Sequence, residues 1–181
     1  MITMRSTAFL AAVVVSFGIP VLAQAENPPP GDIPDNQAFV TVRNAAYSVK
    51  VPEGWQRIKK ASRVTFTDKY NSIRIDVSRS ATRPTMSSVR TTDLAILRRT
   101  VKGFAQPSVT SLNRAAGRVI LVTYRATSPP SAVTGKTVTN DVECYLFWKK
   151  GMLATMTLQA PRGSDNVDPW KIVTDSFTWT R

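Results

Sequence analysis

Two groups of basic side chains are the residues whose types and spacing could bind a charged ligand. The first group comprises Arg57, Lys59, Lys60 and Arg63, and the second comprises Arg98, Arg99 and Lys102. Guanidinium and ammonium groups donate charge-assisted hydrogen bonds to phosphate, carboxylate and sulfate groups. We therefore expect both groups to be candidate binding sites for an anion or an acidic partner, with an ordinary solvated surface as the alternative.

The sequence offers few residues for catalysis. It contains no histidine, which excludes Ser-His-Asp and Cys-His nucleophiles as well as histidine metal sites. Asp141 and Glu143 are two residues apart, so on a strand they share a face and could act as an acid–base pair or hold a hard cation. A solvated face is the favoured interpretation of this pair. We predict no catalytic residue, no metal site and no cofactor.

Cys144 is the only cysteine of the chain, so no internal disulfide can form. It alternates with the apolar residues Val142 and Leu146, which predicts a buried thiol of low reactivity. Without a disulfide the fold must depend on its hydrophobic core, and the chain is long enough to form one.

The charge of the chain is strongly positive and unevenly distributed. There are 24 lysines and arginines against 12 aspartates and glutamates, a net charge of +12. Three acidic residues, Glu26, Asp32 and Asp35, precede Arg43, so the part that follows is more basic than the chain as a whole. Such an excess attracts nucleic acid, anionic lipid, acidic polymers or acidic proteins.

The first 25 residues have the pattern of a secretory signal peptide. Arg5 supplies a positive start, residues 8–17 form an apolar run, and Ala23-Gln24-Ala25 ends the segment with small residues at the positions that signal peptidase requires. The run is shorter than the about 20 residues of a transmembrane helix. We predict cleavage after Ala25 and a secreted or periplasmic product, for which nucleic acid is the least expected partner.

Residues 26–37 are rich in proline and acidic residues, and we expect them to form a mobile linker. Residues 38–181 then form a single domain. Within it, alternating apolar and polar residues predict strands. The expected strands are 47–51, 63–67, 73–77, 108–112, 118–126, 142–148 and 152–158, with a strand end at 177–179. The apolar run in 118–126 predicts a strand that is covered on both faces.

Two helices are expected among these strands. Leu94, Leu97, Val101 and Phe104 recur at helical spacing, which predicts a helix over about 87–102 with Ser87 or Ser88 as its cap. Asp168-Pro169 is typical of a helix start, with aspartate as the cap and proline at the first helical position. Strands followed by isolated helices favour an α+β fold with an antiparallel sheet.

Three local sequences resemble the PsbP-like superfamily. They are Tyr47–Trp55 (YSVKVPEGW), Tyr145–Gly151 (YLFWKKG) and Ser176–Trp179 (SFTW), and the resemblance spans roughly residues 38–180. This superfamily includes the photosystem II subunit PsbP, a eukaryotic Ran-binding relative and bacterial LpqN-type lipoproteins. The resemblance implies a central antiparallel β-sheet flanked by helices, an α-β-α sandwich, and a non-enzymatic role in binding or assembly.

The sequence departs from the superfamily in three respects. The lipid-attachment cysteine of the bacterial lipoproteins is missing at the cleavage site, so we expect a released protein. The metal-site histidines of PsbP have no counterpart, because the chain has no histidine. No residue corresponds to a Ran-contact residue.

Charge, export and resemblance together give the functional hypothesis. We expect an exported, non-catalytic binding or accessory protein that docks through its basic surface on an acidic protein or an anionic envelope component. A secreted hydrolase without a histidine-based site and a structural component of the envelope are the alternatives.

Overall fold

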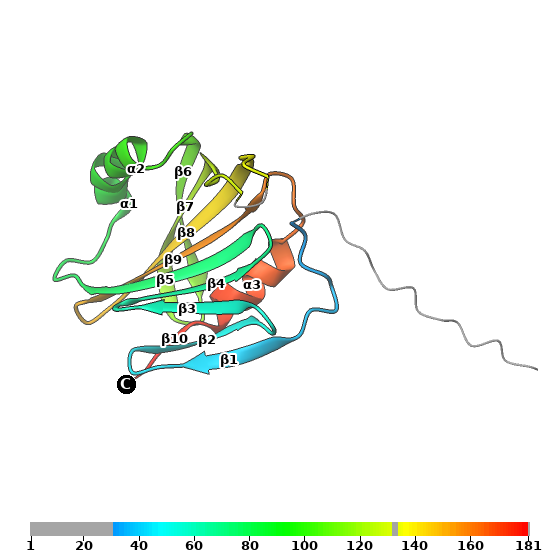
Figure 1. Ribbon diagram of the computed structural model, residues 1–181. Coiled ribbons are helices and arrows are strands. Elements are labelled where there is room, and N and C mark those ends of the chain that lie inside the picture. The colour runs from blue at the N-terminus through cyan, green and yellow to red at the C-terminus, as the bar shows by residue number, and fades with distance from the viewer. Residues whose placement is uncertain (1–30, 132–133, 181) are drawn as a thin grey trace, which may run out of the picture.

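The computed structural model describes residues 31–131 and 134–180, so the predicted signal peptide lies outside the described residues. A seven-stranded antiparallel sheet forms the centre of the molecule, as Figure 1 shows. In spatial order its strands are β3 (Gln56–Lys60), β4 (Arg63–Asp68), β5 (Asn71–Arg79), β9 (Met152–Pro161), β8 (Thr139–Lys149), β7 (Gly117–Thr127) and β6 (Ala105–Arg114). The predicted hairpin of 142–148 and 152–158 is confirmed as β8–β9.

A second, three-stranded sheet packs beside the first. Its strands are β1 (Phe39–Arg43), β2 (Tyr47–Pro52) and β10 (Thr178–Trp179), in the order β1-β2-β10. Trp179 pairs with Tyr47 across β10 and β2. Two of the sequences that carry the PsbP-like resemblance are therefore neighbours in space, although one is near the start of the domain sequence and the other is near its end.

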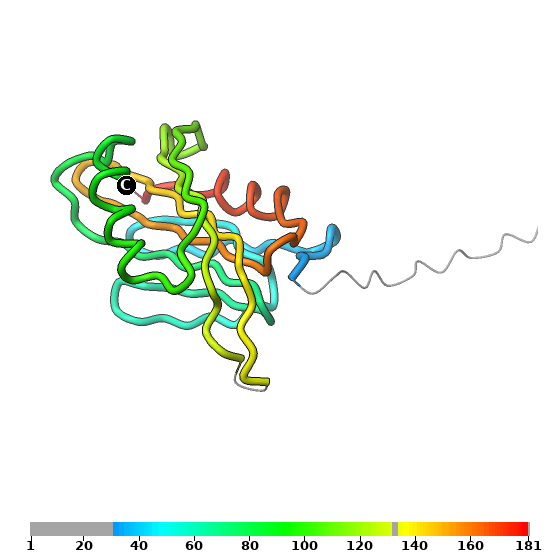
Figure 2. The backbone as a smooth tube through the Cα atoms, turned by 90° about the horizontal axis from the view of Figure 1, so that it is seen from above, coloured from blue at the N-terminus to red at the C-terminus, as the bar shows by residue number. Residues whose placement is uncertain are grey.

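Two helical segments complete the α+β fold. The first consists of α1 (Met86–Ser88), the π-helical η1 (Val89–Asp93) and α2 (Leu94–Thr100), and the second is α3 (Val167–Ser176). Figure 2 shows the two segments well apart, the first in green and the second in red. No helix in the described part of the chain is long and apolar enough to cross a membrane.

The two helical segments cover opposite faces of the large sheet. Neighbouring residues of one strand show this, because their side chains point to opposite sides. In β7, Val119 packs in the cluster that contains α3 and β2, whereas Ile120 packs in the cluster that contains the α1–α2 segment. The prediction that this strand is covered on both faces is confirmed, and the helices flank the sheet as the resemblance implied.

Phe177 lies at the centre of the hydrophobic cluster that contains α3 and β2. Its ring stacks on Phe147 of β8 with 4.3 Å between centroids and on Tyr47 of β2 with 5.4 Å, and it meets the Trp179 ring edge-on at 5.3 Å. Aromatic pairs in these geometries add stability beyond their buried area. One residue directly after α3 therefore joins the small sheet to the large one.

The sequence did not predict strand β3. All five of its residues are exposed, so no alternation of buried and exposed positions marks it. It forms the edge of the large sheet, where charged side chains discourage pairing with another chain. Strand β6 is longer than the predicted 108–112, and it reaches Ala105 through an irregularity before Ser108.

The first predicted helix exists, but its ends differ from the prediction. It begins at Met86 with Thr85 as the cap, and not with Ser87 or Ser88. The Ser88 backbone N–H donates to Thr85 Oγ1 at 3.1 Å, and the Thr85 N–H donates to Ser88 Oγ at 3.0 Å. This reciprocal pair is a capping box, which satisfies two N–H groups at once.

The second helix starts earlier than predicted. Its cap position is Asn166, not Asp168, and Val167 is its first residue. The Asn166 side chain does not cap the helix. It accepts a hydrogen bond from the Ile33 backbone N–H at 2.7 Å and donates one to the Gly31 carbonyl at 2.8 Å. Gly31 and Ile33, which lie within the expected linker, are thus attached to the domain, and Ile33 is only 4% exposed and packs in the core.

Asn166→Ala should lower the free energy of unfolding by about 1–3 kcal/mol, because the buried Ile33 N–H loses its acceptor. Urea denaturation of the full chain measures the change. Asn113→Ala, at an exposed position near the end of β6, is the matched control and should cost less than about 0.5 kcal/mol. Equal losses in the two variants would contradict a specific role for Asn166.

Candidate anion-binding site

The structure separates the first predicted basic group into two faces. Lys60 pairs with Arg63 and Arg57 pairs with Phe66 in the β3–β4 hairpin. Because side chains alternate along a strand, Arg57 and Lys59 project to one side of the sheet while Lys60 and Arg63 project to the other. The Arg57 guanidinium lies 5.9 Å from the centroid of the Phe66 ring. These four residues do not form one site.

Arg63 is also partly neutralised. Its Nε lies 2.6 Å from Asp76 Oδ1, and Arg74 Nε lies 3.0 Å from the other oxygen of the same carboxylate. Surface ion pairs of this kind add about 0.2–1 kcal/mol of stability. Their larger effect here is to lower the positive charge around Lys60, since one carboxylate neutralises part of the charge of two arginines on the same face of the sheet.

The second predicted group stays together at the end of α2. Arg98 and Arg99 lie in the last helical turn, and Lys102 follows in the turn that leads to β6. All three are exposed, and none forms an ion pair with a carboxylate in the described part of the chain. The Thr127 backbone N–H donates to the Lys102 carbonyl at 2.8 Å and fastens this turn to β7.

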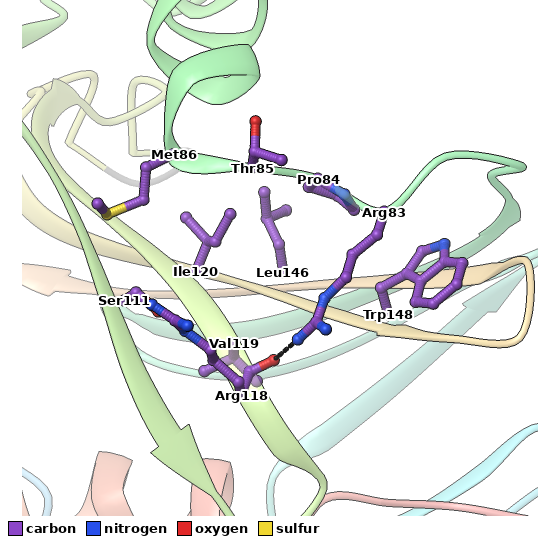
Figure 3. A pocket seen from close by; sticks show the side chains of 10 residues that line it. All are labelled: Arg83, Pro84, Thr85, Met86, Ser111, Arg118, Val119, Ile120, Leu146 and Trp148. Atoms are coloured by element: carbon purple, nitrogen blue, oxygen red, sulfur yellow. Dashed lines mark hydrogen bonds between the residues drawn. The ribbon is translucent and has the colours of Figure 1, made fainter.

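A pocket that the sequence did not predict contains two further arginines. It has a volume of about 350 Å³ and lies on the sheet face that also carries the α1–α2 segment, as Figure 3 shows. Its lining residues are Arg83, Pro84, Thr85, Met86, Ser111, Arg118, Val119, Ile120, Leu146 and Trp148.

Strand register builds the floor of this pocket. Ser111 pairs with Ile120 across β6 and β7, and Ile120 pairs with Leu146 across β7 and β8. Extending the second register by two residues places Arg118 across from Trp148. These five side chains therefore share one face of the sheet.

The opposite wall is the segment between β5 and α1. The capping box of Thr85 fixes its end, and the indole Nε1–H of Trp148 donates to the Ser80 carbonyl at 2.8 Å. In Figure 3, Ile120 and Leu146 lie between this segment and Arg118.

Both arginines of the pocket are held by neutral acceptors. Arg83 Nη2 donates to the Arg118 carbonyl at 3.2 Å, and Arg118 Nε donates to Ser111 Oγ at 2.8 Å. No aspartate or glutamate lines the pocket. Because a guanidinium has five N–H donors, each arginine keeps donors that these bonds do not use.

No local pattern in the sequence indicates this pair. Arg83 and Arg118 are 35 residues apart, and neither belongs to a run of basic residues. Only the register of β6, β7 and β8 and the path of the chain after β5 bring them to one pocket.

The predicted acidic pair takes part in contacts within the fold. Arg125 Nε lies 3.3 Å from Asp141 Oδ1, and the Tyr145 hydroxyl donates to Glu143 Oε2 at 2.6 Å. Burial, followed by the adjacent Glu143, raises the pKa of Tyr145 to about 12. Among the described residues no cluster of three metal-ligating side chains occurs.

Cys144 is buried, as its alternation with apolar residues predicted. Burial raises the pKa of its thiol to about 11, although the Thr157 hydroxyl, which donates to Sγ at 3.8 Å, opposes the effect. The thiolate is the reactive form of cysteine. Cys144 is consequently a poor nucleophile. It packs in the hydrophobic cluster between the large sheet and the α1–α2 segment.

No protein-family model and no curated protein sequence matches the chain. Among solved structures, cyanobacterial PsbP (CyanoP) from Synechocystis sp. PCC 6803 is similar with a TM-score of 0.54 at 13% identity, over 89% of this chain and 99% of that one. LpqN, described as involved in cell envelope biogenesis of Mycobacterium tuberculosis, has a TM-score of 0.44 at 14% identity, over 81% of this chain and 93% of that one.

A protein from Bacteroides thetaiotaomicron has a TM-score of 0.49 at 9% identity over 75% of this chain, and the chain spans 45% of its length. The similarity to CyanoP shows that the chain has a PsbP-like fold, as the resemblance implied. At this identity the likeness concerns the fold and not the activity.

The Cys144 thiol should make stability fall at alkaline pH. Its folded pKa of about 11 exceeds the ordinary value of 9.0, so between these values the folded state keeps a proton that the unfolded chain releases. The contribution is full below pH 9 and is lost as the pH rises through 11. Cys144→Ala should therefore flatten the fall by about 2–3 kcal/mol, measured by urea unfolding at successive pH values. Parallel curves for the two proteins would contradict this assignment.

Proposed function

We propose that this protein is an exported, non-catalytic accessory protein that docks through basic side chains on an acidic protein or an anionic component of the cell envelope. The observation that carries this proposal is the group of Arg98, Arg99 and Lys102, which the fold gathers, exposes and leaves without ion pairs among the described residues. Groups of this kind attract and hold anionic surfaces.

The remaining charge of the molecule supports this choice. Of the 24 lysines and arginines in the chain, the described ion pairs engage Arg63, Arg74, Arg114, Arg125 and Lys171. Most of the positive charge therefore acts on the surroundings of the protein and not on its own carboxylates. Export rests on the signal-peptide pattern that ends at Ala25.

The hydrolase alternative has weaker support. Its nucleophile would have to be a group other than the buried Cys144, whose raised pKa keeps it protonated. Asp141 and Glu143 already contact Arg125 and Tyr145. A structural component of the envelope would be recovered from an envelope extract together with one partner in a fixed stoichiometric ratio. A pull-down with this protein as bait measures that ratio.

Reversing the charge of the exposed group tests the docking surface. The triple variant Arg98→Glu, Arg99→Glu, Lys102→Glu should bind phosphatidylglycerol vesicles or acidic envelope polymer at least about tenfold more weakly, because each basic residue near an anionic surface contributes about 1 kcal/mol. Co-sedimentation at increasing salt measures binding, and the wild-type affinity should fall as salt screens the charges.

The control changes the same net charge elsewhere. Arg43→Glu, Lys50→Glu, Arg162→Glu alters three exposed residues outside the group and should retain most of the binding. Equal losses in the two triple variants, or an affinity that salt does not change, would refute docking through this surface.

A further inference from the structure

We propose that the pocket beside β6–β8 binds a single-chain anionic amphiphile. Its carboxylate or phosphate head lies at Arg83 and Arg118, and its apolar chain lies on Ile120 and Leu146. This inference goes beyond the proposed function, since it assigns a small-molecule site whose residues are separate from the Arg98, Arg99 and Lys102 surface.

The charged half of the pocket selects an anion. Arg83 and Arg118 form no ion pair with any carboxylate in the described residues, and their hydrogen bonds go to a carbonyl and a hydroxyl. No acidic side chain lines the cavity. A carboxylate or phosphate is the group that complements guanidinium donors most strongly.

The other half of the pocket is apolar. Ile120 is buried, Leu146 and Met86 are half-buried, and all three belong to the hydrophobic cluster between the sheet and the α1–α2 segment. Trp148 uses its only donor on the Ser80 carbonyl, so the remainder of its indole presents an apolar surface. An inorganic anion would leave this floor unused, whereas an alkyl chain would bury it.

The pocket is small and formed before a ligand arrives. Its volume of about 350 Å³ lies near the lower end of the range for small-molecule sites, roughly 300–1,000 Å³. Three paired strands form one side, and the segment that the Thr85 capping box fixes forms the other. A fixed site of this size suits a short single chain, because little ordering accompanies binding.

Three probes separate the parts of this proposal. Octanoate carries both a chain and a charge, octanol carries the chain alone, and acetate carries the charge alone. Titration of the isotope-labelled full chain, followed by NMR shifts of Ile120, Leu146 and the Trp148 indole, measures each affinity. Octanoate should bind at least about tenfold more tightly than either of the other two. Equal affinity for octanol, or for acetate, would overturn the proposal.

The variants locate the site. Arg83→Gln with Arg118→Gln should weaken octanoate binding at least about tenfold, while Arg43→Gln, an exposed arginine of the small sheet, should leave it unchanged. Met86→Gln should weaken octanoate binding without affecting acetate. Thermal melting checks that each variant is folded. Equal octanoate affinity in the double variant and in Arg43→Gln would overturn the assignment.

Vesicles identify the source of the amphiphile. If the double variant also loses binding to phosphatidylglycerol vesicles, the natural ligand is a membrane lipid, and if it loses only octanoate, the ligand is a free amphiphile; both results support the site. Docking through the end of α2 is tested by different residues, so failure of one proposal leaves the other measurable.

Discussion

The stacking of Phe177 between the two sheets is the interaction on which the rest of the structure depends. Its ring contacts Phe147 of the large sheet and Tyr47 of the small sheet, and it is completely buried. Because Phe177 directly follows α3, the same residue also fixes where that helix ends and where β10 begins to pair with β2. One aromatic cluster therefore holds α3 and the small sheet on the same face of the large sheet.

A polar network fastens α3 to the same face. Arg114 Nε donates to Thr174 Oγ1 at 3.1 Å and lies 3.4 Å from Asp175, and its Nη2 donates to the Tyr145 hydroxyl at 3.3 Å. Tyr145 in turn donates to Glu143. The acidic residue that sequence alone could assign to catalysis thus belongs to the contacts that hold a helix on a sheet. On the opposite face, the α1–α2 segment packs on side chains of β6, β7 and β8, and the pocket of Arg83 and Arg118 lies on that same face.

The fold was predictable wherever one side of a strand or helix is buried, because burial imposes a period on the sequence. The β8–β9 hairpin and the helix of 86–100 follow this rule, whereas β7, which is covered on both faces, is marked by a continuous apolar run. β3 does not, since all its side chains are exposed. The basic groups show the same limit: residues adjacent in sequence stay together at the end of a helix, as Arg98 and Arg99 do, but divide between faces on a strand. Arg83 and Arg118 meet through the register of three strands and the path of the chain between β5 and α1, neither of which a local sequence pattern records.

The distribution of carboxylates explains why particular arginines remain available. Asp76 serves Arg63 and Arg74, and Asp175 serves Arg114 and Lys171. Because the chain has twice as many basic as acidic residues, a surplus of cations remains even where one carboxylate serves two of them. Like charges repel, so stability alone would favour spreading such cations over the surface. The pocket instead holds two of them over an apolar floor, where only a ligand that carries both a charge and a chain would satisfy both surfaces.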